Sequence, residues 1–264
     1  MVTADFGVED WGHCLEYVVD GTPVELVRPC DTERPTWVAY ENTRCLGTLH
    51  ALIDTRGTWH VQTANEEHVR LDDAVRALRR PPTWSQDRDR ARQWARDCLN
   101  DPRLLIIDIQ TTGLHNAWAV QIGLTDRHGT ALVDELVHPR AEVEPAAVAL
   151  HGISAGRTTT SPTFSMLLPE LTGFMAGRRC LSYNAAFDRG VLERELRRHY
   201  KNDRLQAEAW LQKCTWEDAM RPYAAWKGLW SARYRSYRYQ PLGGVYKAVA
   251  NCRRLLSTMQ HISH

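Results

Sequence analysis

Two polar side chains, Asp108 and Gln110, end an apolar run in the stretch LLIIDIQTTG, residues 104–113. In an extended strand every second side chain leaves the same face, so these two should project together. Oxygen ligands presented in this way are those that hard divalent cations prefer. Gln110, however, is an amide and brings no charge to such a site. The stretch therefore predicts a metal-type site that is short of one carboxylate.

A second acidic residue, Asp188, lies in YNAAFD, residues 183–188, where a strand pattern changes to a helix pattern. The position falls just inside the first turn of the predicted helix. Acidic residues are common there because they interact favourably with the helix dipole. Asp188 alone is therefore consistent with either a structural or a functional role.

The elements that must position these residues begin after a break near residue 82. Before it, residues 13–27 and 44–63 alternate around the turn signals Asp20-Gly21 and Arg56-Gly57, which predicts two hairpins. A short helix then ends at Pro81-Pro82. We predict that residues 1–82 form a small β-rich α+β domain, a three-stranded sheet plus a helix, with no assigned role. Three arginines near the helix end are either solvated charges or nucleic-acid contacts: Arg76, Arg79 and Arg80.

The rest of the chain predicts a connecting helix over 83–101 and an α/β domain over 102–264. The connecting helix can be capped by Ser85, and its alternating Arg and Asp are typical of a solvated surface. Strands are predicted at 104–110 and on both sides of the His128-Gly129 turn, followed by helices and one more strand before Asp188. This order predicts a mixed central sheet covered by helices.

Composition narrows the possible functions. The 264 residues carry a formal net charge of +1, which excludes a global electrostatic attraction to nucleic acid but allows a local basic patch. The seven cysteines are scattered and form no C-x-x-C pair, so we expect reduced thiols rather than disulfides or a zinc site. No apolar run approaches the roughly 18 residues that a membrane span needs, and the N-terminus has no signal-peptide pattern. We expect a soluble, cytoplasmic protein.

Five segments, taken in order, resemble a known family: DIQTTGL, AVQIGLTDRHG, LHGIS, SPTF and YNAAFDRGVL. They are similar to the DEDDh 3′–5′ exonuclease superfamily of ribonuclease T and the DNA polymerase III proofreading subunit. The resemblance covers residues 104–256. It implies a ribonuclease H-like exonuclease fold for this part of the chain.

In that family four carboxylates hold two divalent cations, about 4 Å apart, and a histidine accepts a proton from the attacking water. The resemblance places Asp108 and Gln110 in the first motif and Asp188 in the second. In the third, YKAVANCRRLL at 246–256, Tyr246 replaces the histidine and Asn251 replaces an aspartate. Only Asp108 and Asp188 then remain as metal ligands, so we expect at most one weakly bound Mg²⁺ or Mn²⁺. Tyrosine, with an ordinary pKa near 10, is a poor base.

The residues that would approach nucleic acid are retained. The resemblance implies that five residues contact the 3′ nucleotide: Thr111, Thr112, Gly113, Leu114 and Phe187. Residues 223–240 also interleave aromatic side chains with basic ones, including Lys227, Arg233, Arg235 and Arg238. This stretch either stacks on a single strand or packs a long loop onto the body of the protein.

The sequence therefore predicts an exonuclease-fold protein that is catalytically inactive or strongly impaired. We expect it to bind single-stranded nucleic acid or its 3′ end, alone or with a protein partner in a nucleic-acid-processing complex. One alternative is an active metal-dependent 3′–5′ exonuclease with an altered site. The other is a protein-interaction scaffold.

Overall fold

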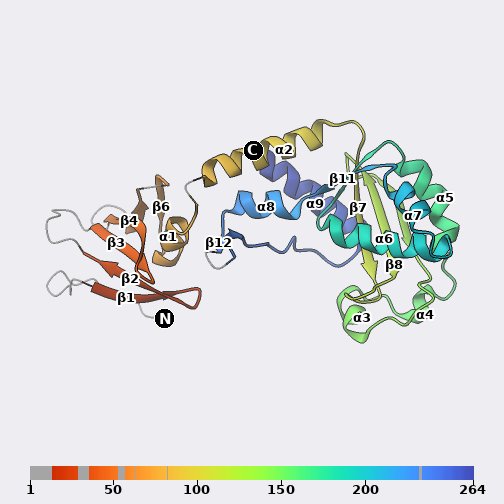
Figure 1. Cartoon of the computed structure of the whole chain (residues 1–264), viewed down its shortest axis with the longest axis horizontal. Helices are drawn as coiled ribbons and strands as arrows, with labels where there is room; N and C mark the ends of the chain where they lie inside the picture. The colour runs from red at the N-terminus through yellow and green to blue at the C-terminus, as the bar shows by residue number, and fades with distance from the viewer. Residues whose placement is uncertain (1–13, 29–35, 53–56, 63, 82, 232–233) are drawn as a thin grey trace. The chain divides into compact units, whose positions relative to one another are not determined.

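The chain forms two compact units in the computed structural model, which describes residues 14–28, 36–52, 57–62, 64–81, 83–231 and 234–264 (Figure 1). The first unit comprises Met1–Trp84 together with Gly228–Arg238, and the second comprises Ser85–Lys227 together with Tyr239–His264. The segment Gly228–Arg238, which lies within the predicted second domain in sequence, therefore groups with the first unit.

The first unit contains a six-stranded antiparallel sheet in the order β1-β2-β3-β4-β5-β6. Its strands and following helix are β1 (Cys14–Val19), β2 (Thr22–Val27), β3 (Thr36–Glu41), β4 (Arg44–Leu52), β5 (Thr58–Val61), β6 (Glu66–His68) and α1 (Leu71–Leu78). Both predicted hairpins are present, as β1–β2 and β4–β5. The prediction of three strands was wrong, because β3 pairs with β2 and β4 and is joined to β4 by a two-residue turn without glycine, Asn42-Thr43, in which both residues have positive φ.

Helix α1 packs its apolar face against this sheet, and its basic residues are paired with acids. Ala74, Val75 and Leu78 join the core around Leu26 and Leu49. The three arginines form close ion pairs: Arg76 with Asp20 (2.7 Å), Arg79 with Glu41 (2.8 Å) and Arg80 with Glu66 (2.8 Å). These pairs favour a structural role for the cluster over a nucleic-acid contact.

The second unit contains a five-stranded mixed sheet in the order β11-β10-β7-β8-β9. Strand β10 runs parallel to β7 and β11, whereas β8 runs antiparallel to β7 and β9. The strands are β7 (Leu104–Thr111), β8 (Ala119–Asp126), β9 (Ala131–Leu136), β10 (Arg179–Ser182) and β11 (Thr215–Asp218). The predicted α/β fold class, a mixed central sheet covered by helices, is confirmed.

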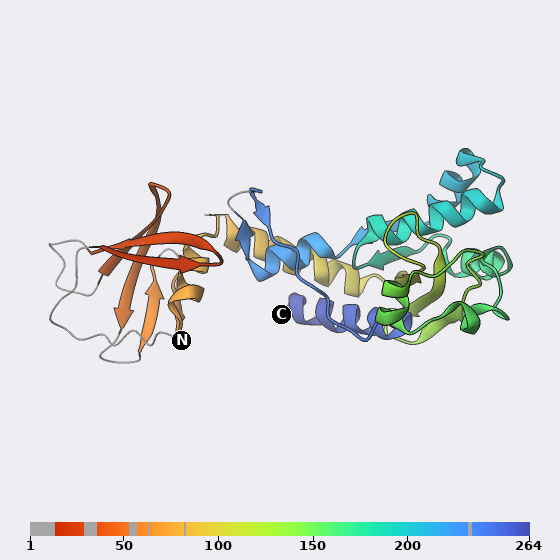
Figure 2. The ribbon, with the colours of Figure 1, turned by 90° about the horizontal axis from the view of Figure 1, so that it is seen from below.

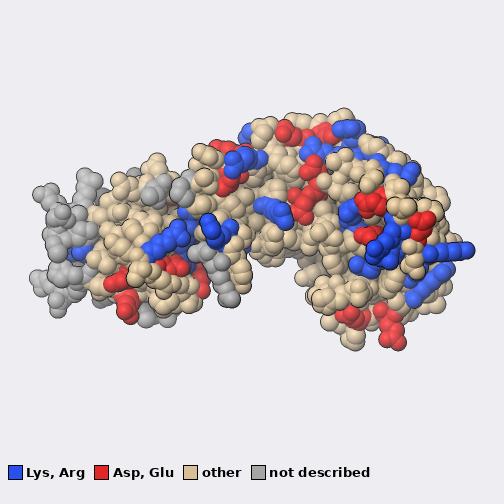
Figure 3. Space-filling view, in the orientation of Figure 1, with Lys and Arg blue, Asp and Glu red and all other residues tan. Residues whose placement is uncertain are grey.

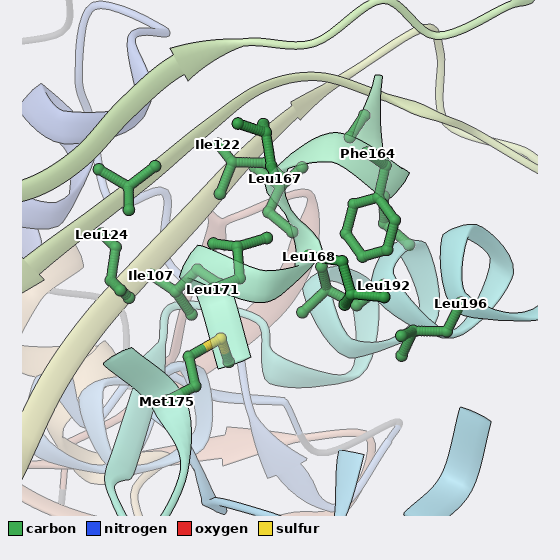
Figure 4. Close-up of a cluster of buried hydrophobic side chains, with 14 of the residues drawn as sticks. Ile107, Ile122, Leu124, Phe164, Leu167, Leu168, Leu171, Met175, Leu192 and Leu196 are labelled. Carbon is green, nitrogen blue, oxygen red and sulfur yellow. The ribbon is translucent and has the colours of Figure 1, made fainter. Parts of the chain in front are cut away.

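The described helices that accompany this sheet are α2 (Trp84–Asn100), α3 (Pro145–His151), α4 (Ala155–Thr158), α5 (Phe164–Met175), α6 (Ala185–His199), α7 (Arg204–Leu211), α8 (Met220–Lys227) and α9 (Ala248–Ser263). Helices α5, α6 and α7 pack on one face, where Phe164, Leu171 and Leu192 meet Ile107 and Ile122 (Figure 4). Helices α2, α8 and α9 lie side by side and share a second core (Figures 1 and 2).

Successive side chains of β7 point to opposite faces of the sheet and pack in these two cores. Leu105, Ile107 and Ile109 face the α5–α6 side, whereas Leu104 and Ile106 face the α9 side. Because side chains alternate along a strand, residues 108 and 110 also belong to the α9 side. The sheet register therefore points both polar residues of the first motif at α9.

The aromatic and basic stretch 223–240 is divided between the two units. On α8 the rings of Tyr223 and Trp226 stack with centroids 6.2 Å apart, and Lys227 lies over both rings. The short strands β12 (Trp230–Ser231) and β13 (Ser236–Tyr237) pair in the first unit, where the Trp230 and Tyr237 rings meet edge to face. Arg233 lies outside the described residues. These ring contacts favour the packing alternative over a continuous stacking platform.

Two further expectations concern the cysteines and membrane-spanning segments. The six described cysteines are free thiols, and Cys30 lies outside the described residues. Among the helices that the structure describes, none is long and apolar enough to cross a membrane.

Candidate active site and nucleic-acid groove

The first and third motifs meet at Asp108. Asp108 and Gln110 project from the end of β7 toward α9, and Asn251 comes from the first turns of that helix. The Gln110 Nε2 atom donates a hydrogen bond to Asp108 Oδ2 at 2.6 Å, and the Asn251 Nδ2 atom donates to the same oxygen at 3.2 Å. One carboxylate oxygen thus accepts hydrogen bonds from two amides.

Asp188 lies in the first turn of α6 and is almost completely buried. Its Oδ1 accepts the backbone N–H of Ile109 at 3.0 Å, and its Oδ2 accepts the hydroxyl of Ser182 at the end of β10. Each oxygen of Asp188 therefore already has a donor from the sheet. These bonds fix the N-terminus of α6 against the carboxyl end of β7.

Both carboxylates have a pKa above the ordinary value for aspartate. Burial raises the pKa of Asp108 to about 6, and the hydrogen bonds from Gln110 and Asn251 oppose that rise. Burial also raises the pKa of Asp188 well above its ordinary value, and the nearby charge of Asp108 adds to the increase. Two carboxylates that share a site disfavour each other's ionised form.

Tyr246 stands apart from this hydrogen-bonded cluster. It precedes α9 by two residues, has a left-handed backbone (φ 50°) and is 49% exposed. No hydrogen-bond partner for its hydroxyl is found among the described residues. The ring lines the same groove as Asp108, so the structure places Tyr246 at the site without connecting it to a carboxylate.

The cluster forms the floor of a groove of about 420 Å³. All the predicted site residues line it except Thr112, which is buried and accepts the backbone N–H of Trp118 through its hydroxyl at 3.0 Å. Exposed apolar side chains stand at the rim, with Leu114 75% and Leu150 55% exposed. The groove thus combines a polar floor with an apolar rim.

Several lining residues were not predicted as site residues. His151 contacts the Thr111 carbonyl through Nε2 at 3.0 Å and accepts the Ile153 N–H at Nδ1 at 3.0 Å, so both ring nitrogens are engaged. It lies in the LHGIS segment, whose resemblance was the available signal. The Glu144 carboxylate covers Gly113, where a Cβ would come within 2.1 Å of Oε1.

The loop 241–244 supplies another unpredicted wall. A Cβ on Gly244 would come within 2.5 Å of Asn251 Oδ1, so the absence of a side chain lets the loop approach Asn251. The Tyr183 hydroxyl donates to the Gln240 carbonyl and holds the start of the same loop. The pair Gly243-Gly244 was the only sequence signal for this close approach.

The residues present do not fit the two-cation site that the resemblance implies. Within the described part of the chain, no group of three or more His, Cys, Asp or Glu side chains could hold a metal ion. Of the two carboxylates, Asp188 has donors on both oxygens and Asp108 has two amide donors on one. A cation here would be held by these two carboxylates alone, which bring too little charge to hold a second ion.

Comparison with known proteins shows a family match for part of this unit. The model of the family described as "Exonuclease" (RNase_T) matches residues 105–224. The uncharacterized exonuclease CP81 of Escherichia phage 186 is 26% identical over 196 residues, which cover 66% of this chain and 92% of the phage protein. The epsilon subunit of Escherichia coli DNA polymerase III is 28% identical over 104 residues, covering 35% of this chain and 43% of the subunit.

Among solved structures, exonuclease X in complex with 5′ overhanging duplex DNA is 22% identical, with a TM-score of 0.41. That match covers 60% of this chain and 90% of exonuclease X. The chain spans less than half the length of the epsilon subunit that it matches. The family match includes β7 with Asp108 and α6 with Asp188, and it ends within α8. Residues 105–224 are thus similar to the exonuclease family.

Proposed function

We propose that this chain binds the 3′ end of a single-stranded nucleic acid in the groove and cleaves it slowly or not at all. The exonuclease-family domain supports nucleic acid as the ligand class. The groove retains the Thr111–Leu114 segment and Phe187 beside Asp108. A pure interaction scaffold would give no reason for keeping both the groove and its apolar rim.

One observation carries the proposal of impaired cleavage. Gln110 and Asn251 donate two N–H groups to the carboxylate oxygen that cation binding would need. Carboxylates at these positions would instead repel Asp108 and would require a cation between them. The amides therefore satisfy the cluster without metal, and Tyr246 supplies no competent base at neutral pH.

Restoring the family residues tests this mechanism. The combined variant Gln110→Glu, Tyr246→His and Asn251→Asp should digest a 5′-labelled single strand from its 3′ end with Mg²⁺, whereas the starting protein should leave the strand nearly intact. Loss of a general base alone typically costs about 10²–10⁴ in rate, and a metal pair needs both added carboxylates, so single reversions should have little effect. Efficient Mg²⁺-dependent digestion by the starting protein would establish the active-exonuclease alternative instead.

Binding is tested separately from cleavage. Fluorescence anisotropy with short single strands should show saturable binding by the unchanged chain, and Leu114→Ala should weaken it because the exposed rim side chain is lost. The exposed Leu205 on α7 does not line the groove, so Leu205→Ala serves as the matched control. If the unchanged chain does not bind, or if both variants weaken binding equally, the groove is not the nucleic-acid site.

A further inference from the structure

A second, basic pocket of about 360 Å³ lies in the exonuclease-family unit. We call it the α6 pocket; it is lined by Trp118, Arg194, Arg197, Arg198, Lys201 and Asn202. On the face drawn in Figure 3, basic side chains gather where Figure 1 places α6. The chain as a whole is nearly neutral, so this concentration is local.

Two guanidinium groups of the α6 pocket are held in place. Arg194 Nε donates to the Ala117 carbonyl at 2.9 Å. Arg198 lies 4.0 Å from the centroid of the Trp118 ring, and its NH1 donates to the Pro139 carbonyl at 2.7 Å. Guanidinium groups fixed in this way retain further N–H donors at little entropic cost for binding an anion.

The charges of the α6 pocket are only partly compensated. Four of the residues that line the pocket are basic, and none of the lining residues is acidic. Glu195, which pairs with Arg198 at 2.5 Å, is buried beneath it and also accepts the Ala119 N–H. Arg197 Nε is buried without a hydrogen-bond partner among the described residues. The pocket therefore has unused donors and a positive balance, which suits a phosphodiester backbone.

The α6 pocket is connected to the groove by two elements. Helix α6 carries Phe187 and Asp188 at its groove end, and Arg194 and Arg197 follow at about 9 and 14 Å along the helix axis at 1.5 Å per residue. The segment 112–118 runs from the groove rim at Leu114 to Trp118. Helix α6 and the segment 112–118 therefore join the groove to the pocket, so a strand longer than the groove can extend toward the pocket.

We propose that the α6 pocket binds phosphates of the nucleic-acid strand whose 3′ end occupies the groove. This inference rests on the proposed function, because it assigns the pocket to the same ligand. It adds a second contact region that favours longer strands and draws its affinity from charge. Its binding should therefore depend strongly on salt, whereas the apolar rim of the groove should not.

The test compares two strand lengths with the full chain. Arg197→Gln combined with Lys201→Gln removes two pocket charges whose side chains make no hydrogen bond or ion pair in the described structure. Arg127→Gln combined with Lys213→Gln removes the same charge from the β8–β9 turn and from the residues after α7, and is the matched control. Anisotropy is measured with labelled single strands of about 4 and about 12 nucleotides, which span the usual site sizes.

The pocket variant should bind the short strand as the unchanged chain does and the long strand more weakly. Each lost phosphate contact lowers the slope of log affinity against log salt by about 0.7, so the slope for the long strand should fall by about 1.4. A long-strand affinity and slope equal to those of the control variant would overturn the inference and leave the groove proposal standing. Failure of the unchanged chain to bind either strand would instead refute the proposed function.

Discussion

Replacing Asp108 with asparagine should stabilise the folded protein at neutral and alkaline pH. Burial raises the pKa of this carboxyl from 3.8 to about 6, a difference of about 2 pKa units. At about 1.4 kcal/mol per unit, the ionised side chain costs the folded state up to about 3 kcal/mol. The substituted amide would keep an oxygen for the N–H groups of Gln110 and Asn251 but would lose their charge-assisted strength, so we expect a net gain of about 1–2 kcal/mol.

The gain should depend on pH in a defined direction. Because the pKa is higher in the folded state than in the unfolded chain, protonation of Asp108 favours folding. This contribution is fully present below about pH 4 and is lost as the pH rises through about 6. The Asp108→Asn variant should therefore differ least from the unchanged chain at pH 4 and most above pH 7.

Urea unfolding at several values between pH 4 and pH 8 measures the effect. The control is Asp134→Asn, because Asp134 is exposed and also accepts an amide N–H, from Gln121 at 2.8 Å. That variant should show no comparable gain. If Asp108→Asn is no more stable than the unchanged chain at pH 8, or if its advantage does not shrink toward pH 4, the carboxylate is not held in the unfavourable environment described here.

Three further predictions concern the same unit. Gln110→Glu should lower the free energy of unfolding by about 2–3 kcal/mol in EDTA, because it replaces a hydrogen-bond donor 2.6 Å from Asp108 with a like charge. Mg²⁺ should restore part of this loss. The control is Gln121→Glu, which removes the donor of the exposed Gln121–Asp134 pair, and equal losses in the two variants would contradict the argument. Gly244→Ala should displace Asn251 and thereby raise the pKa of Asp108, because the hydrogen bond from Asn251 lowers that pKa. Carboxyl NMR titration measures the change, and an unchanged pKa would show that the loop 241–244 moves instead of Asn251. Gly123→Ala should destabilise by about 3 kcal/mol, because its Cβ would lie 2.6 Å from the α9 backbone, whereas Gly173→Ala in α5, with nothing within 4 Å, should be neutral or stabilising in the same urea assay.

Period-two alternation was sufficient to predict how the first motif is presented. Residues 104 and 106 enter the α9 core, and the same periodicity places Asp108 and Gln110 on that side. The change from strand to helix pattern likewise located Asp188 in the first turn of α6. These features are local, because each depends on residues within one element.

Features created by distant parts of the chain were not predictable in this way. The hydrogen bond from Asn251 to Asp108 joins residues 143 positions apart and depends on how α9 crosses the sheet, which a close approach at Gly123 permits. The assignment of Gly228–Arg238 to the first unit interrupts the second unit in sequence. The α6 pocket likewise needs Trp118 from β8's leading loop beside the end of α6. Contacts between residues so far apart in the chain produce no periodic pattern in the sequence.

The two amides at the site, Gln110 and Asn251, have a common physical consequence. Four clustered carboxylates would be unstable without cations, because each added negative charge raises the pKa of its neighbours. Gln110 and Asn251 remove that repulsion and donate to Asp108, while Asp188 is satisfied by Ser182 and Ile109. Both carboxylates consequently accept hydrogen bonds from the protein without a metal. Because these hydrogen bonds need no metal, the proposed strand binding should persist in EDTA, and the variants above can test binding separately from cleavage.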